Sequence, residues 1–155
     1  MYNFFHVLAD TSVLIDYVRR LQKDQTLMHT LFERSMPVVA AVTEFEFCIG
    51  RNAQNTRLMS SMMAKLPVIP MDTTIAKIAI DVHWTLKQKN ALIGTNDIFI
   101  AATALRFEIP IATLNRKHFS RVETDFGILI HDKNSVSPFN AHFSKQGVAT
   151  PCYEA

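Results

Sequence analysis

Short, continuous apolar runs that alternate with longer helical patterns most constrain how this chain of 155 residues can fold. Residues 36–42 and 109–113 are apolar at nearly every position, which is typical of strands that are covered on both faces of a parallel sheet. Shorter apolar runs at residues 4–9, 66–69 and 126–130 predict three further strands.

Helical periodicity fills the segments between these runs. The clearest pattern covers residues 72–89, where the apolar side chains fall on one stripe and Asp72 fits the N-cap. Five further helices are predicted over residues 11–22, 25–34, 43–51, 55–65 and 97–107. Strands that alternate with helices over this length predict an α/β sandwich around a mostly parallel sheet.

The composition predicts a single folded domain. With 48% apolar and 19% charged residues, the chain can bury a full core, which excludes an intrinsically disordered protein. The net charge of +2 does not indicate a strongly basic nucleic-acid-binding surface. We expect residues 1–131 to form the domain and residues 132–155 to be a C-terminal extension that is irregular or partly disordered.

The chain carries no pattern that predicts a membrane segment or export. Its apolar stretches are far shorter than the ~20 residues of a membrane span, and its start, MYNFFHVLAD, lacks the basic region of a signal peptide. Two cysteines, Cys48 and Cys152, are too few for a disulfide scaffold. We therefore expect a soluble, cytoplasmic protein without membrane contact.

Acidic and amide side chains follow several of the predicted strands. Asp10 ends the first apolar run, Glu46 lies in the helix after the second run with Glu44 as a competing acid, and Asp97 opens a helix after a Gly-Thr-Asn loop. Asn115 follows the fourth run. Because ligand sites of open α/β sheets lie beyond the carboxyl ends of the strands, these side chains are expected to converge on one edge.

Converging carboxylates raise one another's pKa unless a cation neutralises them. An all-oxygen set of donors suits Mg²⁺ or Mn²⁺, and such ions activate water and stabilise the leaving oxygen in phosphodiester hydrolysis. Each residue also has an ordinary structural explanation: Asp10 and Asp97 as helix caps, Glu46 as a solvated helix residue, and Asn115 in a turn. From the residues alone, both explanations stay open.

Four blocks carry these residues in order: ADTSVLIDYVR, VTEFEFCIG, IGTNDIFIAATAL and IATLNRKHFSRV. The second has the form Thr-x-x-Glu-x-x-x-Gly, and the fourth has the form Thr-x-Asn/Asp-x-x-x-Phe. Together, residues 6–130 resemble the PIN-domain family, and more closely the VapC-type ribonuclease toxins of prokaryotic toxin–antitoxin operons.

The resemblance implies a PIN-like three-layer α/β/α sandwich of about five strands and a metal-dependent endoribonuclease that acts as a toxin. It selects Glu46 over Glu44, and it implies that Asp10, Glu46 and Asp97 hold Mg²⁺ or Mn²⁺. Asn115 would assist at a position where many relatives carry Asp, which puts a second metal in doubt.

Residues that contact the RNA are less sharply indicated. Thr11 and Ser12 would hydrogen-bond a metal-bound water or a phosphate, with helix capping as the equal alternative. Arg116 and Lys117 follow Asn115 directly and would meet phosphates, although an exposed run of charges is more often simply solvated.

The resemblance also implies partners. In relatives, the helices that correspond to residues 57–66 form a groove for the C-terminal segment of a cognate antitoxin, and homodimers are common. Leu58, Met59, Met62 and Met63 would line such a groove, and the alternative is that at least two of these methionines lie in the core. Two alternatives remain: a non-cleaving PIN-fold module that binds RNA or protein, and a PIN nuclease outside any toxin system.

Overall fold

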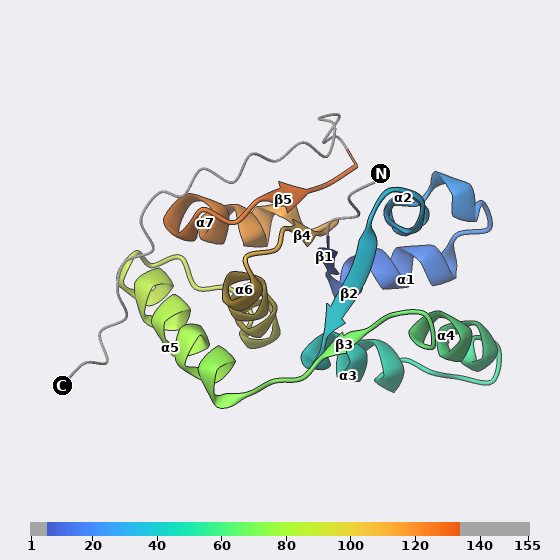
Figure 1. Cartoon of the computed structure of the whole chain (residues 1–155), viewed down its shortest axis with the longest axis horizontal. Coiled ribbons are helices and arrows are strands. Elements are labelled where there is room, and N and C mark those ends of the chain that lie inside the picture. The colour runs from blue at the N-terminus through green and yellow to red at the C-terminus, as the bar shows by residue number, and fades with distance from the viewer. Residues whose placement is uncertain (1–5, 134–155) are drawn as a thin grey trace.

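A computed structural model describes residues 6–133, which fold into a five-stranded parallel sheet with helices on both faces (Figure 1). The strands are β1 (His6–Ala9), β2 (Met36–Ala40), β3 (Val68–Ile69), β4 (Ile111–Ala112) and β5 (Ile130–His131). Their order is β3-β2-β1-β4-β5, and every neighbouring pair is parallel. The predicted sandwich around a parallel sheet is confirmed.

Seven α-helices and one short 3₁₀ turn connect the strands of the described part. They are α1 (Thr11–Arg19), η1 (Lys23–Gln25), α2 (Leu27–Arg34), α3 (Ala41–Ile49), α4 (Thr56–Met63), α5 (Thr73–Gln88), α6 (Thr95–Phe107) and α7 (Arg116–Phe126). In residues 6–133, none of these helices combines the length and apolar character that crossing a membrane requires.

Side chains of the central strand alternate between two cores. Leu8 of β1 packs with residues of α5, α6 and α7, whereas Val7 and Ala9 pack with residues of α1, α2 and α4. Because successive strand residues point to opposite faces, this alternation makes three layers, with the sheet between two sets of helices. Met59 and Met62 are each 3% exposed, as expected for two core methionines.

The chain reverses its direction of winding beside β1. After β1 it adds β2 and then β3 on one side, and it later adds β4 and β5 on the other. The pairing of Ala9 with Ala112 makes Asp10 and Thr113 the next residues at the same edge of the sheet. In open α/β sheets, such a reversal leaves a crevice beyond the carboxyl ends of the strands, where ligands bind.

The sequence prediction missed α7 and misplaced β5. The segment RKHFSRVETDF is polar apart from a few positions, and only Phe119 and Val122 of this helix are buried. The helix continues to Phe126 and ends at Gly127, whose φ of +70° suits glycine, so β5 begins later than predicted. Residues 134–155, which make up most of the predicted C-terminal extension, lie outside the described residues.

Candidate metal-dependent site at the carboxyl edge of the sheet

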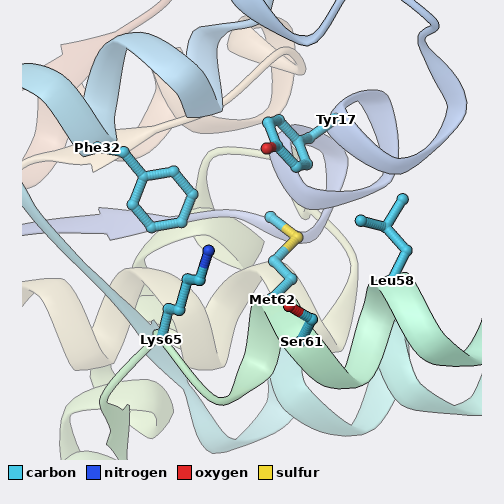
Figure 2. Close-up of a pocket in the computed structure, with 6 residues that line it drawn as sticks. All are labelled: Tyr17, Phe32, Leu58, Ser61, Met62 and Lys65. Carbon is cyan, nitrogen blue, oxygen red and sulfur yellow. The ribbon is translucent and has the colours of Figure 1, made fainter.

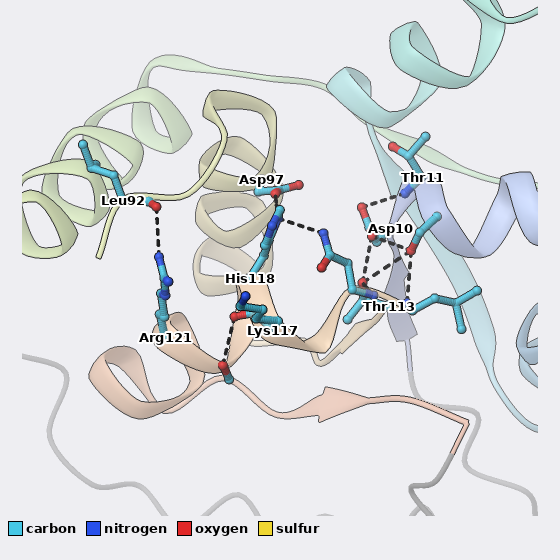
Figure 3. A network of polar contacts seen from close by, with 12 residues as sticks. Asp10, Thr11, Leu92, Asp97, Thr113, Lys117, His118 and Arg121 are labelled. Atoms are coloured by element: carbon cyan, nitrogen blue, oxygen red, sulfur yellow. Dashed lines mark hydrogen bonds and ion pairs between the residues drawn. The ribbon is translucent and has the colours of Figure 1, made fainter. Parts of the chain in front are cut away.

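Asp10 is the buried carboxylate at the centre of this edge. It follows β1, caps α1 and is 5% exposed. Oδ1 accepts a hydrogen bond from the backbone N–H of Thr11 (2.8 Å), and Oδ2 accepts bonds from the hydroxyls of Ser12 (2.7 Å) and Thr113 (2.8 Å) (Figure 3). These donors fix the orientation of the carboxylate.

The environment of Asp10 disfavours its negative charge. Burial raises the pKa of the Asp10 carboxyl above its ordinary value, and the nearby charge of Asp97 raises it further. The hydrogen bonds from Ser12, Thr113 and Thr11 favour the ionised form but do not cancel the rise in pKa. A positive charge at this edge would therefore stabilise the carboxylate more than any neutral donor does.

Glu46 reaches the same edge from α3, the helix that follows β2. Its Oε1 accepts a hydrogen bond from the hydroxyl of Thr11 (3.2 Å), so Thr11 contacts Glu46 through its side chain and Asp10 through its backbone. Glu44 is exposed, whereas Glu46 is half-buried. The hydroxyls of Thr11 and Ser12 are thus directed at carboxylates in this structure.

Asp97 and Asn115 meet at the ring of His118. Nδ1 of His118 lies 2.7 Å from Oδ2 of Asp97 and 2.7 Å from Nδ2 of Asn115 (Figure 3). Asp97 lies in the first turn of α6, whose N-cap is Gly94, so Asp97 is not the cap of that helix. Asn115 is the N-cap residue of α7, but its side chain makes no capping bond.

The four oxygen-bearing side chains form two linked pairs. Asp10 and Glu46 are joined through Thr11, and Asp97 and Asn115 are joined through His118. Among residues 6–133, no three side chains of the His, Cys, Asp or Glu type are gathered closely enough to hold an ion. The donor set still fits a hard divalent cation, because carboxylate and amide oxygens are its preferred ligands and Asp10 needs a positive partner.

Thr113 was quoted within the fourth sequence block but was given no role there. It is fully buried, its hydroxyl donates to Asp10, and the same oxygen accepts from the backbone N–H of Asn115 (2.9 Å). Its place directly after β4 is the signal that could have identified it, since site residues of such sheets follow the strands.

Comparison with known proteins decides the family. The family model of the PIN domain matches residues 7–124, which is most of this chain. This chain belongs to the PIN domain family.

Relatives of this PIN-domain chain carry VapC names. It is 30% identical over 128 residues to Ribonuclease VapC1 of Methanocaldococcus jannaschii, covering 82% of this chain and 88% of the relative. It is 27% identical over 117 residues to Ribonuclease VapC10 of Mycobacterium tuberculosis, covering 76% of this chain and 88% of that relative.

Solved structures of VapBC complexes share the PIN fold. DNA-bound VapBC from Salmonella typhimurium matches with a TM-score of 0.73 at 20% identity, over 83% of this chain and 98% of that chain. VapBC-1 from nontypeable Haemophilus influenzae matches with a TM-score of 0.68 at 21% identity, over the same two shares. At these identities, the likeness shows the fold.

The basic residues after Asn115 differ in how they are held within the PIN domain. Arg116 forms ion pairs with Glu123 (3.2 Å) and Asp132 (3.3 Å), which fasten the start of α7. Lys117 is exposed, and no side-chain contact of its ammonium group is recorded among residues 6–133. Lys117 is therefore the more available cation of the two.

A hollow lies on the outer face of the PIN domain, among α1, α2 and α4 (Figure 2). It is lined by Tyr17, Phe32, Leu58, Ser61, Met62 and Lys65. The rings of Tyr17 and Phe32 meet edge to face, with centroids 6.4 Å apart. The hollow thus combines aromatic and aliphatic side chains with the polar groups of Ser61 and Lys65.

Proposed function

We propose that this chain is a metal-dependent endoribonuclease that hydrolyses RNA phosphodiester bonds as the toxin of a toxin–antitoxin pair. The observation that carries the proposal is the environment of Asp10, which lies at the point where the sheet reverses its winding. Two hydroxyls donate hydrogen bonds to this carboxylate, and its burial and the charge of Asp97 raise its pKa. The VapC names of its relatives support the same activity.

Asp10, Glu46 and Asp97 would hold Mg²⁺ or Mn²⁺, with Asn115 assisting. When bound, the ion supplies an activated water and charge stabilisation at the leaving oxygen. Thr113, Ser12 and the backbone of Thr11 hold Asp10 in one orientation, so its oxygens need not reorganise when the ion binds.

The RNA-contacting roles of Thr11, Ser12, Arg116 and Lys117 stay predictions. Thr11 and Ser12 each have one hydroxyl proton, which here is directed at Glu46 or Asp10, so both hydroxyls would mainly position the acids. Lys117 is the best placed to meet a phosphate, because Arg116 is paired with two carboxylates.

The hollow among α1, α2 and α4 would bind the antitoxin. Its mixed apolar and polar lining suits an amphipathic segment, and the structural neighbours are toxin–antitoxin complexes. A Leu58→Glu variant would lose the complex and keep RNA cleavage, because Leu58 lines the hollow and none of the proposed metal-binding acids does. Retention of a wild-type complex by this variant would exclude the hollow as the docking site.

Self-association is proposed on the exposed face of α3. Phe45 and Ile49 lie four residues apart on one side of this helix and are 61% and 67% exposed. A homodimer would cover both side chains, and light scattering on a Phe45→Glu variant tests whether the mass falls to that of one chain.

The deciding experiment is cleavage of a small-RNA pool by purified, partner-free protein with Mg²⁺, with Mn²⁺ and with EDTA. Asp97→Asn should abolish cleavage and leave the fold intact. Asp16→Asn is the matched control, because the half-buried Asp16 pairs with Arg20 (2.7 Å) and Lys133 (3.5 Å) rather than with the acids of the site, and its loss should affect cleavage little.

Discrete fragments that require both the cation and Asp97 are the expected result. Full activity of Asp97→Asn, or equal cleavage in EDTA, would contradict the proposed site. The absence of cleavage by folded wild-type protein under every metal condition would instead favour the non-cleaving binding module.

A further inference from the structure

His118 occupies a position that the proposed function leaves unused. It lies in the first turn of α7, and its ring contacts Asp97 (Figure 3) and also Asn115. Its Nδ1 is 2.7 Å from Oδ2 of Asp97 and 2.7 Å from Nδ2 of Asn115. One ring nitrogen therefore serves two side chains that the proposed function directs toward a cation.

With the amide nitrogen of Asn115 facing the ring, the two contacts make opposite demands on Nδ1. Nδ1 donates to Asp97 only if it carries a proton, and it accepts from the Asn115 amide only if it does not. Exchanging the nitrogen and oxygen of the Asn115 amide leaves one N–H facing two oxygens. In each arrangement, three converging polar atoms compete for a single proton position.

A cation removes this competition, because it accepts a lone pair from Oδ2 of Asp97, from unprotonated Nδ1 of His118 and, once the amide is exchanged, from Oδ1 of Asn115. Adjacent ligands of an octahedral Mg²⁺-like site lie about 3 Å apart, given metal–ligand distances of about 2.1 Å. The two contacts of Nδ1, at 2.7 Å each, are close to that spacing when Oδ1 of Asn115 takes the position given to Nδ2. The spacing thus suits three donors to one ion as well as it suits hydrogen bonds.

On the basis of the proposed function, we infer that Nδ1 of His118 is a donor to the same divalent cation, beside Asp97 and Asn115, and that the site therefore favours Mn²⁺ over Mg²⁺. Mg²⁺ strongly prefers oxygen ligands, whereas later first-row ions accept imidazole nitrogen more readily. Asn115 brings one negative charge fewer than an Asp would, and the imidazole supplies a strong neutral donor next to it.

Two variants of His118 distinguish the loss of any ligand atom at this position from the exchange of its nitrogen for oxygen. His118→Ala removes the donor. His118→Asn places an amide oxygen near the position of Nδ1 and so converts the set to oxygen donors alone. His83→Asn is the matched control, because His83 lies on α5 against the ring of Trp84.

The measurement is binding of Mn²⁺ and of Mg²⁺ to metal-free full-length protein by calorimetry, with electron spin echo spectroscopy of bound Mn²⁺. Wild type and His83→Asn should show nitrogen modulation from a bound imidazole. In His118→Ala, Mn²⁺ affinity should fall by about tenfold or more. His118→Asn should bind both ions, without nitrogen modulation and with a lower Mn²⁺ to Mg²⁺ affinity ratio.

The outcomes distinguish this inference from the proposed function. Mn²⁺ binding that needs Asp97 but shows no nitrogen modulation in wild type would overturn the role of His118 and leave the nuclease site standing. An unchanged affinity ratio in His118→Asn would do the same. Failure of wild type to bind either ion, with the fold intact by thermal unfolding, would overturn both.

Discussion

The hydroxyl of Thr113 donates a hydrogen bond of 2.8 Å to Oδ2 of Asp10, which joins the residue after β4 to the residue after β1. The same hydroxyl oxygen accepts the backbone N–H of Asn115 at 2.9 Å. One buried side chain therefore orients the central carboxylate and fixes the start of the loop that carries Asn115. The two strands that flank the reversal of the sheet are locked together at the site.

Replacing Thr113 by valine is expected to weaken metal binding and RNA cleavage by about tenfold or more, as is typical when a side chain that orients a metal ligand is lost. The N–H of Asn115 would also lose its acceptor, at a cost of about 1–3 kcal/mol of stability. Thr113→Ser keeps the hydroxyl and should restore most of both properties. Calorimetric Mn²⁺ titration and urea unfolding measure the two effects, and a Thr113→Val protein with wild-type metal affinity would contradict the positioning role.

Asp10→Asn is expected to raise the thermal stability of the metal-free protein at pH 7 while abolishing cleavage. Burial and the charge of Asp97 raise the pKa of Asp10 above its unfolded value, so ionised Asp10 costs folding free energy at every pH above that raised pKa. An amide removes this cost, and the hydroxyls of Ser12 and Thr113 can rotate to accept from it.

Thermal unfolding of wild type and Asp10→Asn in EDTA and in excess Mn²⁺ checks this expectation. In EDTA the variant should melt at the higher temperature. In Mn²⁺ only wild type should gain stability, because only the native wild type binds the ion. A variant that is less stable than wild type in EDTA would show that the ionised carboxylate of Asp10 does not destabilise the folded protein.

The sheet could be predicted from the sequence because buried parallel strands leave continuous apolar runs. The runs that gave β2 and β4 bracket the observed strands, and the apolar stripe of residues 72–89 gave α5 almost to its ends. Helix α7 could not be predicted from the sequence, because only two of its residues, Phe119 and Val122, are buried. Two buried positions are too few to give a recognisable helical period.

The candidate site could be predicted only in part. Asp10 and Asp97 follow a strand or open a helix, so a rule about sheet edges indicates them, whereas the family resemblance was needed to prefer Glu46 over Glu44. The side chains that contact these acids are not indicated by any sequence pattern. Thr113 is one threonine within an apolar run, and His118 lies in a segment whose charges predict a basic surface. Their roles depend on contacts across 103 and 21 residues of sequence.

Glu108→Gly is expected to stabilise the protein by about 0.5–1 kcal/mol. Glu108 is the C-cap of α6 and has φ of 53°, in the left-handed region. A residue with a Cβ atom has a higher conformational energy there than glycine has. For a chain of this size, the melting temperature should rise by about 1–4 °C. Glu108→Ala is the control, since it keeps the backbone strain, and an equal rise in both variants would attribute the effect to the lost charge.

His131 is expected to make the protein less stable as the pH falls below neutrality. Burial lowers the pKa of its imidazole below the ordinary value of 6.5, and the charge of Asp132 offsets this shift only in part. The unfolded chain therefore binds a proton at a higher pH than the folded chain does. The contribution of neutral His131 to the free energy of unfolding keeps its full value above pH 6.5. It declines as the pH falls from there through the lower pKa of the folded state. Urea unfolding of wild type and His131→Gln in EDTA, at pH 8 and at pH 5, should show the smaller decline in the variant, and parallel declines would contradict the burial of a neutral imidazole at the end of β5.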